Sequence, residues 1–93
     1  MVSITWTALA IEDLRNIYDY ILKDSKVYAD RIIDNIITRV DQLSYFPKSG
    51  RVVPEFENDS IRELIQGNYR IIYKLTAQKI SIIRIHHSAR LMK

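Results

Sequence analysis

The sequence has no cysteine, only two glycines and two prolines, and no long apolar run. Without cysteine there is no disulfide, no thiolate nucleophile and no cysteine-based zinc site. The apolar runs are far shorter than the roughly 20 residues that span a bilayer. Residues 1–6 lack the basic start and apolar stretch of a secretory signal. We therefore expect a cytoplasmic protein that has no membrane contact and needs no metal ion or other cofactor.

Acidic residues are scarce in one part of the chain. Residues 60–93 contain seven lysines and arginines but a single acid, Glu63, whereas residues 1–59 contain seven basic and ten acidic residues. Such an asymmetry is typical of a surface that faces a polyanion. A basic half that simply packs against an acidic helical half would give the same counts. Because a chain this short buries only about 60–65% of its surface, we expect one domain over 1–93.

Hydrophobic periodicity predicts a short strand followed by two helices. Residues 2–6 alternate between apolar and polar, as in a half-buried strand. Apolar residues then recur every three or four positions over 8–23 and 26–45, which indicates an antiparallel hairpin of amphipathic helices. Thr7 is the expected N-cap of the first helix, and Asp13 lies early in it, where an acid suits the helix dipole.

The period changes from 3.6 to 2 after a polar loop over 46–60. Strands are predicted over 61–66, 69–75 and 80–87, and Gly67-Asn68 suits a type II′ hairpin turn between the first two. The predicted order is βααβββ. This is an α+β fold in which a helical hairpin packs on one face of a mostly antiparallel four-stranded sheet.

The Gly67-Asn68 turn also predicts which side chains share a face of the sheet, since it sets Ile65 opposite Arg70. One face is mostly apolar and should contact the helices. Arg62 falls on that side, at an edge, and His87 should also pack there, because neighbours in a strand point to opposite faces. We expect the other face to be open and to display Glu63, Arg70, Lys74, Arg84 and His86.

Two interpretations of this charged face remain open from the residues alone. Charged pairs across strands often serve only to keep an exposed sheet soluble. A guanidinium, however, matches two phosphate oxygens at once and stays charged, so clustered arginines also suit a phosphate or an acidic polypeptide.

Motifs along nearly the whole chain resemble the RelE/ParE toxins. The most specific is the strand Tyr69-Arg70-Ile71-Ile72-Tyr73, which follows Arg62-Glu63-Leu64. Other matching segments are Asp13-Leu14-Arg15-Asn16-Ile17-Tyr18, Phe46-Pro47, Gly50-Arg51, Pro54-Glu55 and Ile85-His86-His87-Ser88-Ala89-Arg90. The resemblance implies the toxin of a type II toxin–antitoxin system. Its partner would be a small, acidic cognate antitoxin, through which alone the toxin reaches operator DNA.

The resemblance implies two alternative mechanisms. In the ParE-like branch, which we favour because of the long helical hairpin and the Phe-Pro, Gly-Arg and Pro-Glu segments, the toxin does no chemistry and inhibits DNA gyrase. In the RelE-like branch it cuts mRNA on the ribosome, which requires a base, an acid and a cation over the phosphate. There, Arg70 would clamp the phosphate, His86 would exchange protons, and Glu55 would be the partner base.

Further residues are candidates for contact with the substrate or target in either branch. They are Arg51, Arg62, Glu63, Lys74, Arg84, His87 and Arg90. A metal site at His86 and His87 is not expected, because adjacent strand residues point apart and no third ligand is near in sequence. An unrelated small nucleic-acid-binding α+β domain is the third interpretation.

Overall fold

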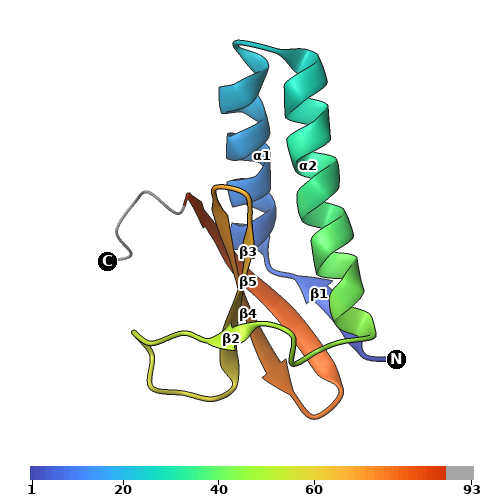
Figure 1. Ribbon diagram of the computed structural model, residues 1–93, viewed down its shortest axis with the longest axis vertical. Helices are drawn as coiled ribbons and strands as arrows, with labels where there is room; N and C mark the ends of the chain where they lie inside the picture. Colours follow the sequence, from blue (N-terminus) through green and yellow to red (C-terminus); the bar gives the residue numbers. More distant parts are fainter. Residues whose placement is uncertain (88–93) are drawn as a thin grey trace.

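The computed structural model of the chain describes residues 1–87. Helices α1 (Ala8–Leu22) and α2 (Lys26–Asp41) form the predicted hairpin, and the 3-10 turn η1 (Gln42–Ser44) follows α2. Figure 1 shows the two helices side by side, packed against the sheet at one end and extending beyond it at the other. In residues 1–87, no helix is long and apolar enough to cross a bilayer.

The sheet has five strands in the order β1-β5-β4-β3-β2, one more than the sequence predicts. The strands are β1 (Ser3–Trp6), β2 (Arg51–Val52), β3 (Ile61–Gln66), β4 (Tyr69–Thr76) and β5 (Lys79–His87). β1 runs parallel to β5 and the other neighbours are antiparallel, so the α+β fold is confirmed. The unpredicted strand, β2, is too short to show an alternating pattern.

Local hydrogen bonds explain where the elements begin and turn. The Thr7 hydroxyl accepts from the Ala10 N–H at 3.1 Å, which confirms the predicted N-cap. The same hydroxyl lies 2.9 Å from the Ile82 carbonyl, to which it donates, so it also ties the start of α1 to β5. In the β3–β4 turn Gly67 has a φ of 58° and Asn68 does not have positive φ, as a type II′ turn requires.

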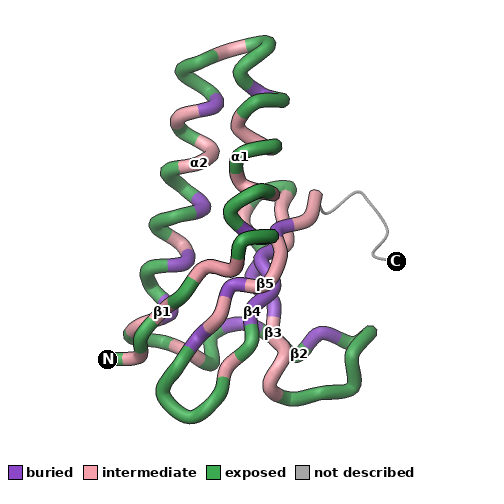
Figure 2. Tube along the Cα trace, turned by 180° about the vertical axis from the view of Figure 1, so that it is seen from behind, coloured by how far each residue is buried: buried purple, intermediate pink, exposed green. Residues whose placement is uncertain are grey.

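The hydrophobic core lies between the hairpin and one face of the sheet, where buried residues of the two layers meet (Figure 2). Tyr73 is completely buried in it, and Tyr69 packs against its margin. The Tyr73 hydroxyl donates to the Pro47 carbonyl at 2.8 Å and accepts from the Gly50 N–H at 3.0 Å. These bonds fix the loop after α2 to the centre of the sheet.

A β-bulge in β5 determines which face the last strand presents. The β4–β5 register shifts between Ile72 and Tyr73, so that Arg84 lies opposite Ile72 but Ile82 lies opposite Tyr73. Strict alternation would put Ile82 and Arg84 on the same face of the sheet. The extra residue at the bulge, Ile83, shifts the alternation by one position, so these two side chains point to opposite faces. Ile82 is therefore buried in the core while Arg84 lies on the face away from the helices.

Candidate functional site

The sheet face away from the helices gathers all three residues that the RelE-like interpretation makes catalytic. Arg70 on β4 lies directly opposite His86 on β5. Glu55, in the loop between β2 and β3, reaches over the sheet, and its carboxylate lies 3.2 Å from Nη2 of Arg70. We call Arg51, Glu55, Glu63, Arg70, Arg84 and His86 the sheet-face cluster.

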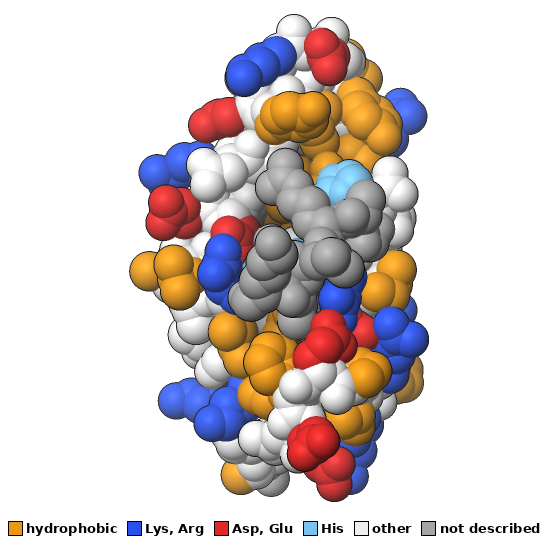
Figure 3. All heavy atoms as spheres, turned by 90° about the vertical axis from the view of Figure 1, so that its left-hand side faces the viewer, with side chains coloured by type: hydrophobic (Ala, Val, Ile, Leu, Met, Phe, Trp, Pro, Cys, Tyr) orange, Lys and Arg blue, Asp and Glu red, His pale blue; other side chains and the backbone are white. Residues whose placement is uncertain are grey.

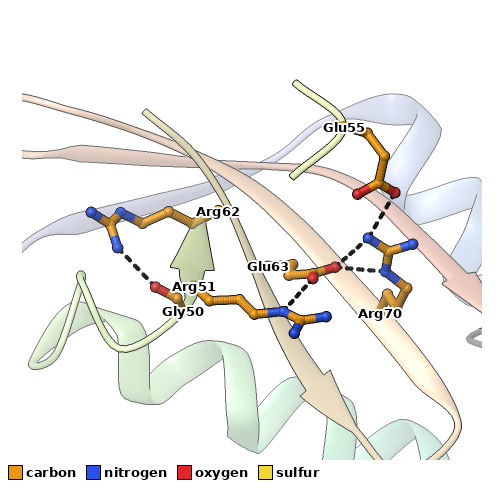
Figure 4. Close-up of polar contacts among 6 residues, drawn as sticks. All are labelled: Gly50, Arg51, Glu55, Arg62, Glu63 and Arg70. Atoms are coloured by element: carbon orange, nitrogen blue, oxygen red, sulfur yellow. Dashed lines mark hydrogen bonds and ion pairs between the residues drawn. The ribbon is translucent and has the colours of Figure 1, made fainter. Parts of the chain in front are cut away.

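Glu63 is the centre of this cluster (Figure 4). Its carboxylate accepts from Nε of Arg70 at 2.6 Å and from Nε of Arg51, its partner across β2 and β3, also at 2.6 Å. The prediction that Glu63 lies on the face away from the helices is correct, but the prediction that it is displayed there is wrong, because Glu63 is only 1% exposed. A buried carboxylate needs such partners, since an unpaired charge there would be strongly unfavourable.

A hollow of about 530 Å³ lies next to the Glu55–Arg70 pair. Its lining is mainly apolar and comes from the loop, β3, β4 and β5: Glu55, Phe56, Ile61, Ile72, Ile83, Arg84 and His86. Ile83 lines this hollow because the bulge turns it away from the core, whereas strict alternation with Arg84 would put it on the helix side. The face is thus a shallow apolar hollow with a charged rim.

Asp13 joins α1 to the rim of the hollow. Its two carboxylate oxygens accept from Nε and Nη2 of Arg84 at 2.8 and 3.0 Å, and one of them also accepts from the Ile85 N–H at 2.9 Å. Burial acts to raise the pKa of Asp13, but the bonds from Arg84 and Ile85 outweigh it and leave the pKa lowered. The predicted helix-dipole role of Asp13 is replaced by this tertiary contact.

The protonation states of the predicted catalytic residues follow from their neighbours. Burial, followed by the positive charge of Arg84, lowers the pKa of His86, so the imidazole is mainly neutral at pH 7. A hydrogen bond to its own backbone, followed by the bond from Arg70, lowers the pKa of Glu55 and keeps it ionised. Burial acts to lower the pKa of Arg70, but the hydrogen bonds to Glu63 and Glu55 outweigh it and leave the pKa raised.

The remaining predicted contact residues do not join the cluster. Arg62 lies on the helix side as predicted, and its Nη1 donates to the Gly50 carbonyl at 2.9 Å. Lys74 is exposed on β4, four residues from Arg70, which is roughly 13 Å along a strand. His87 makes an edge-to-face contact with Tyr69, the ring centroids being 5.3 Å apart. Arg90 lies outside the described residues.

A second groove, of about 580 Å³, lies between α1 and the ends of β4 and β5. Arg84 and His86 line both this groove and the apolar hollow, so the two are neighbours across β5. The predicted separation of the histidines is confirmed by the register, which pairs His86 with Arg70 and His87 with Tyr69. Within residues 1–87, no group of three or more His, Cys, Asp or Glu side chains is arranged to hold a metal ion.

Sequence reasoning missed two residues of the site, Asp13 as a partner of Arg84 and Phe56 as a wall of the hollow. Asp13 and Arg84 are 71 positions apart, so no local pattern links them. Phe56 is an aromatic residue in an otherwise polar loop and is 49% exposed. An isolated aromatic residue in such a loop is the sequence feature that could have indicated a binding surface.

Comparison with known proteins identifies the family. Residues 4–92 match the family described as the ParE toxin of type II toxin-antitoxin system, parDE. The chain belongs to the ParE toxin family. It is also 35% identical, over 98% of its length and 100% of the relative's, to Toxin RelE2 of Caulobacter vibrioides. Both ParE and RelE therefore occur among the names of its relatives.

Solved structures of ParE and RelE toxins share the fold. A chain of the chromosomal ParDE TA system from P. aeruginosa superposes with a TM-score of 0.77 at 27% identity, covering 94% of this chain and 96% of that one. A chain of the toxin–antitoxin complex RelBE2 from Mycobacterium tuberculosis superposes with a TM-score of 0.70 at 20% identity, covering 92% and 96%. Because it belongs to the ParE toxin family and is 35% identical to a relative named as a toxin, the protein is a toxin of a type II toxin–antitoxin system.

Proposed function

We propose that this ParE-family toxin acts in the cytoplasm by binding and inhibiting DNA gyrase, without catalysing a reaction. The observation that carries the proposal is the state of Arg70. Its side chain is only 14% exposed, and its guanidinium is bonded by two carboxylates of its own chain, those of Glu63 and Glu55. An arginine that clamps a reacting phosphate must offer its N–H groups to the phosphate oxygens.

The protonation states around Arg70 support the same proposal. Cleavage of RNA through the ribose 2′-OH needs an acid for the leaving 5′-oxygen as well as a base. The pKa of Glu55 and the pKa of His86 are both lowered, so at neutral pH both groups are bases. Among the described residues of the cluster, Arg51, Arg70 and Arg84 stay charged and Glu63 is held in ion pairs, which leaves no proton donor suited to the step.

A ribosome-dependent endoribonuclease is the second candidate, and one observation favours it. Glu55 and His86, which come from a loop and a strand, line one hollow, and Arg70 lies opposite His86 and is bonded to Glu55. For this function, the contacts of Arg70 with Glu55 and Glu63 would have to open when substrate binds.

The antitoxin partner would be a small acidic protein encoded beside the toxin, and the toxin would reach operator DNA only through it. The hollow, whose lining is mainly apolar, supports an antitoxin segment that inserts apolar side chains there. The neighbouring reading frame should then encode a protein of net negative charge.

Purified toxin tests the two candidates side by side. We expect it to inhibit supercoiling by DNA gyrase and to leave cleaved DNA, and to leave mRNA intact on translating ribosomes. Arg70→Ala and His86→Gln serve as the paired variants, because a nuclease would lose its activity with either one. Ribosome-dependent mRNA cleavage that Arg70→Ala abolishes, with gyrase unaffected, would refute the proposal in favour of the endoribonuclease.

A further inference from the structure

Each arginine of the sheet-face cluster is bonded by a carboxylate of the same chain. Arg70 is bonded by Glu63 and Glu55, and Arg51 by Glu63. Arg84 is held at two points by Asp13. In Figure 3, basic and acidic side chains accordingly lie next to one another on this side of the molecule, where its described residues are visible. These carboxylates occupy N–H groups that a phosphate would otherwise use.

Two of the three carboxylates come from outside the sheet, whereas Glu63 is on β3. Asp13 belongs to α1, and Glu55 belongs to the loop that precedes β3. We infer that Asp13 and Glu55 are built-in substitutes for phosphate, which prevent the arginines of this face from binding nucleic acid. The inference goes beyond the proposed function, because it concerns what the toxin avoids rather than what it inhibits.

The positions of the arginines show why such a device is needed. Arg70 lies opposite His86 and Arg84 lies opposite Ile72, so the two arginines are diagonal neighbours on one face. Diagonal neighbours of adjacent strands are about 7–8 Å apart, which is less than the Debye length of about 10 Å at moderate salt. Released from their carboxylates, they would act together on a single nucleic-acid strand, and DNA and RNA would compete with the protein target.

The three carboxylates differ in how far they are buried, and only those of Glu55 and Asp13 are exposed enough to be replaced without disturbing the sheet. The Glu63 side chain has no exposed surface, and removing its charge would disturb the packing of the sheet. The Glu55 side chain is 43% exposed at the rim of the hollow, and the Asp13 side chain is 14% exposed in the neighbouring groove. Glu55→Gln and Asp13→Asn therefore neutralise a carboxylate with little change of shape.

The loop also offers a matched control. Glu57 lies two residues from Glu55, is exposed, and has no ion-pair partner within residues 1–87. Glu57→Gln changes the net charge by the same amount as Glu55→Gln but releases no arginine. Any difference between these two variants reports the release of Arg70 and not the overall charge of the protein.

The test is binding of a labelled oligouridylate RNA to the purified toxin, followed by fluorescence anisotropy over a salt titration. We expect Glu55→Gln and Asp13→Asn to bind about threefold to fivefold more tightly than Glu57→Gln at low salt. The slope of log K against log salt should become more negative by about 0.7, the value for one added phosphate contact on a single strand.

The double variant Glu55→Gln/Arg70→Gln tests whether the gain in RNA affinity depends on Arg70. Its affinity for the RNA should return to that of Glu57→Gln. The inference is overturned if Glu55→Gln and Glu57→Gln bind the RNA equally, or if the gain persists without Arg70. Circular dichroism confirms that each variant is folded, and if Asp13→Asn is not, the Glu55 pair decides alone. Gyrase takes no part in this assay, so its outcome is independent of the proposed target.

Discussion

Replacing Glu63 with glutamine should strongly destabilise the toxin. The carboxylate is completely buried and accepts hydrogen bonds from both Arg51 and Arg70 at 2.6 Å. Glutamine keeps the shape but removes the charge and directs an amide N–H₂ group toward a guanidinium. Breaking a buried ion pair in this way costs about 3–5 kcal/mol. For a domain of this size, that corresponds to a fall in Tm of roughly 12 °C or more.

Thermal and urea unfolding, followed by circular dichroism, measure this loss. Glu55→Gln is the matched control, because its carboxylate also contacts Arg70 but is 43% exposed, and its Tm should stay close to that of the natural chain. The double variant Glu63→Met/Arg70→Met removes the buried carboxylate and its partly buried guanidinium partner and should be more stable than Glu63→Gln, since apolar pairs often replace buried ion pairs without loss.

A Glu63→Gln variant whose free energy of unfolding lies within about 1 kcal/mol of that of the natural chain, the range of an exposed pair, would contradict this prediction. The reasoning would also be refuted if the methionine pair were less stable than Glu63→Gln. In that case, burial of Glu63 would stabilise the sheet through shape and not through charge.

Two further changes test other parts of the molecule. In Gly50→Ala the new Cβ would lie 2.6 Å from the Tyr73 hydroxyl and 2.7 Å from the Glu63 carbonyl. This crowding should lower the free energy of unfolding by about 1–3 kcal/mol. An unchanged midpoint of urea unfolding would contradict the prediction. The lowered pKa of His86 means that protonation favours unfolding, so the stability it contributes is present above pH 6.5 and is lost as the pH falls through the lower pKa of the folded state. Between pH 7.5 and 5, the Tm of the natural chain should therefore fall more steeply than that of His86→Gln, and equal slopes would count against the lowered pKa.

The elements and the strand register could be predicted because they depend on local patterns. Periodicity places both helices, and the Gly67-Asn68 turn alone sets Ile65 opposite Arg70, as the structure confirms. The same register puts Glu63 and Arg70 on the face away from the helices. These predictions required only the repeat lengths of helix and strand and the backbone freedom of one glycine.

Burial of the site could not be predicted, because it depends on contacts between distant segments. The buried Glu63 carboxylate is bonded by Arg51, which belongs to a strand of only two residues that no repeat describes. The bulge at Ile83 changes which side chains of β5 point to the core, and no glycine or proline marks its position in the sequence. Arg84 finds its carboxylate on a helix 71 positions away. The sequence therefore predicts which residues share a face but not how much of that face stays open.

The charge asymmetry of the sequence has its physical explanation in these distant contacts. The basic segment after residue 59 contains one acid, Glu63, and the other carboxylates on its arginines, Asp13 and Glu55, belong to the acidic segment before it. Folding thus pairs the two segments, so the excess of basic residues over 60–93 is partly neutralised within the toxin. A segment that looks suited to a polyanion becomes a face with balanced charge around an apolar hollow, and such a face is better suited to a protein than to a phosphate chain.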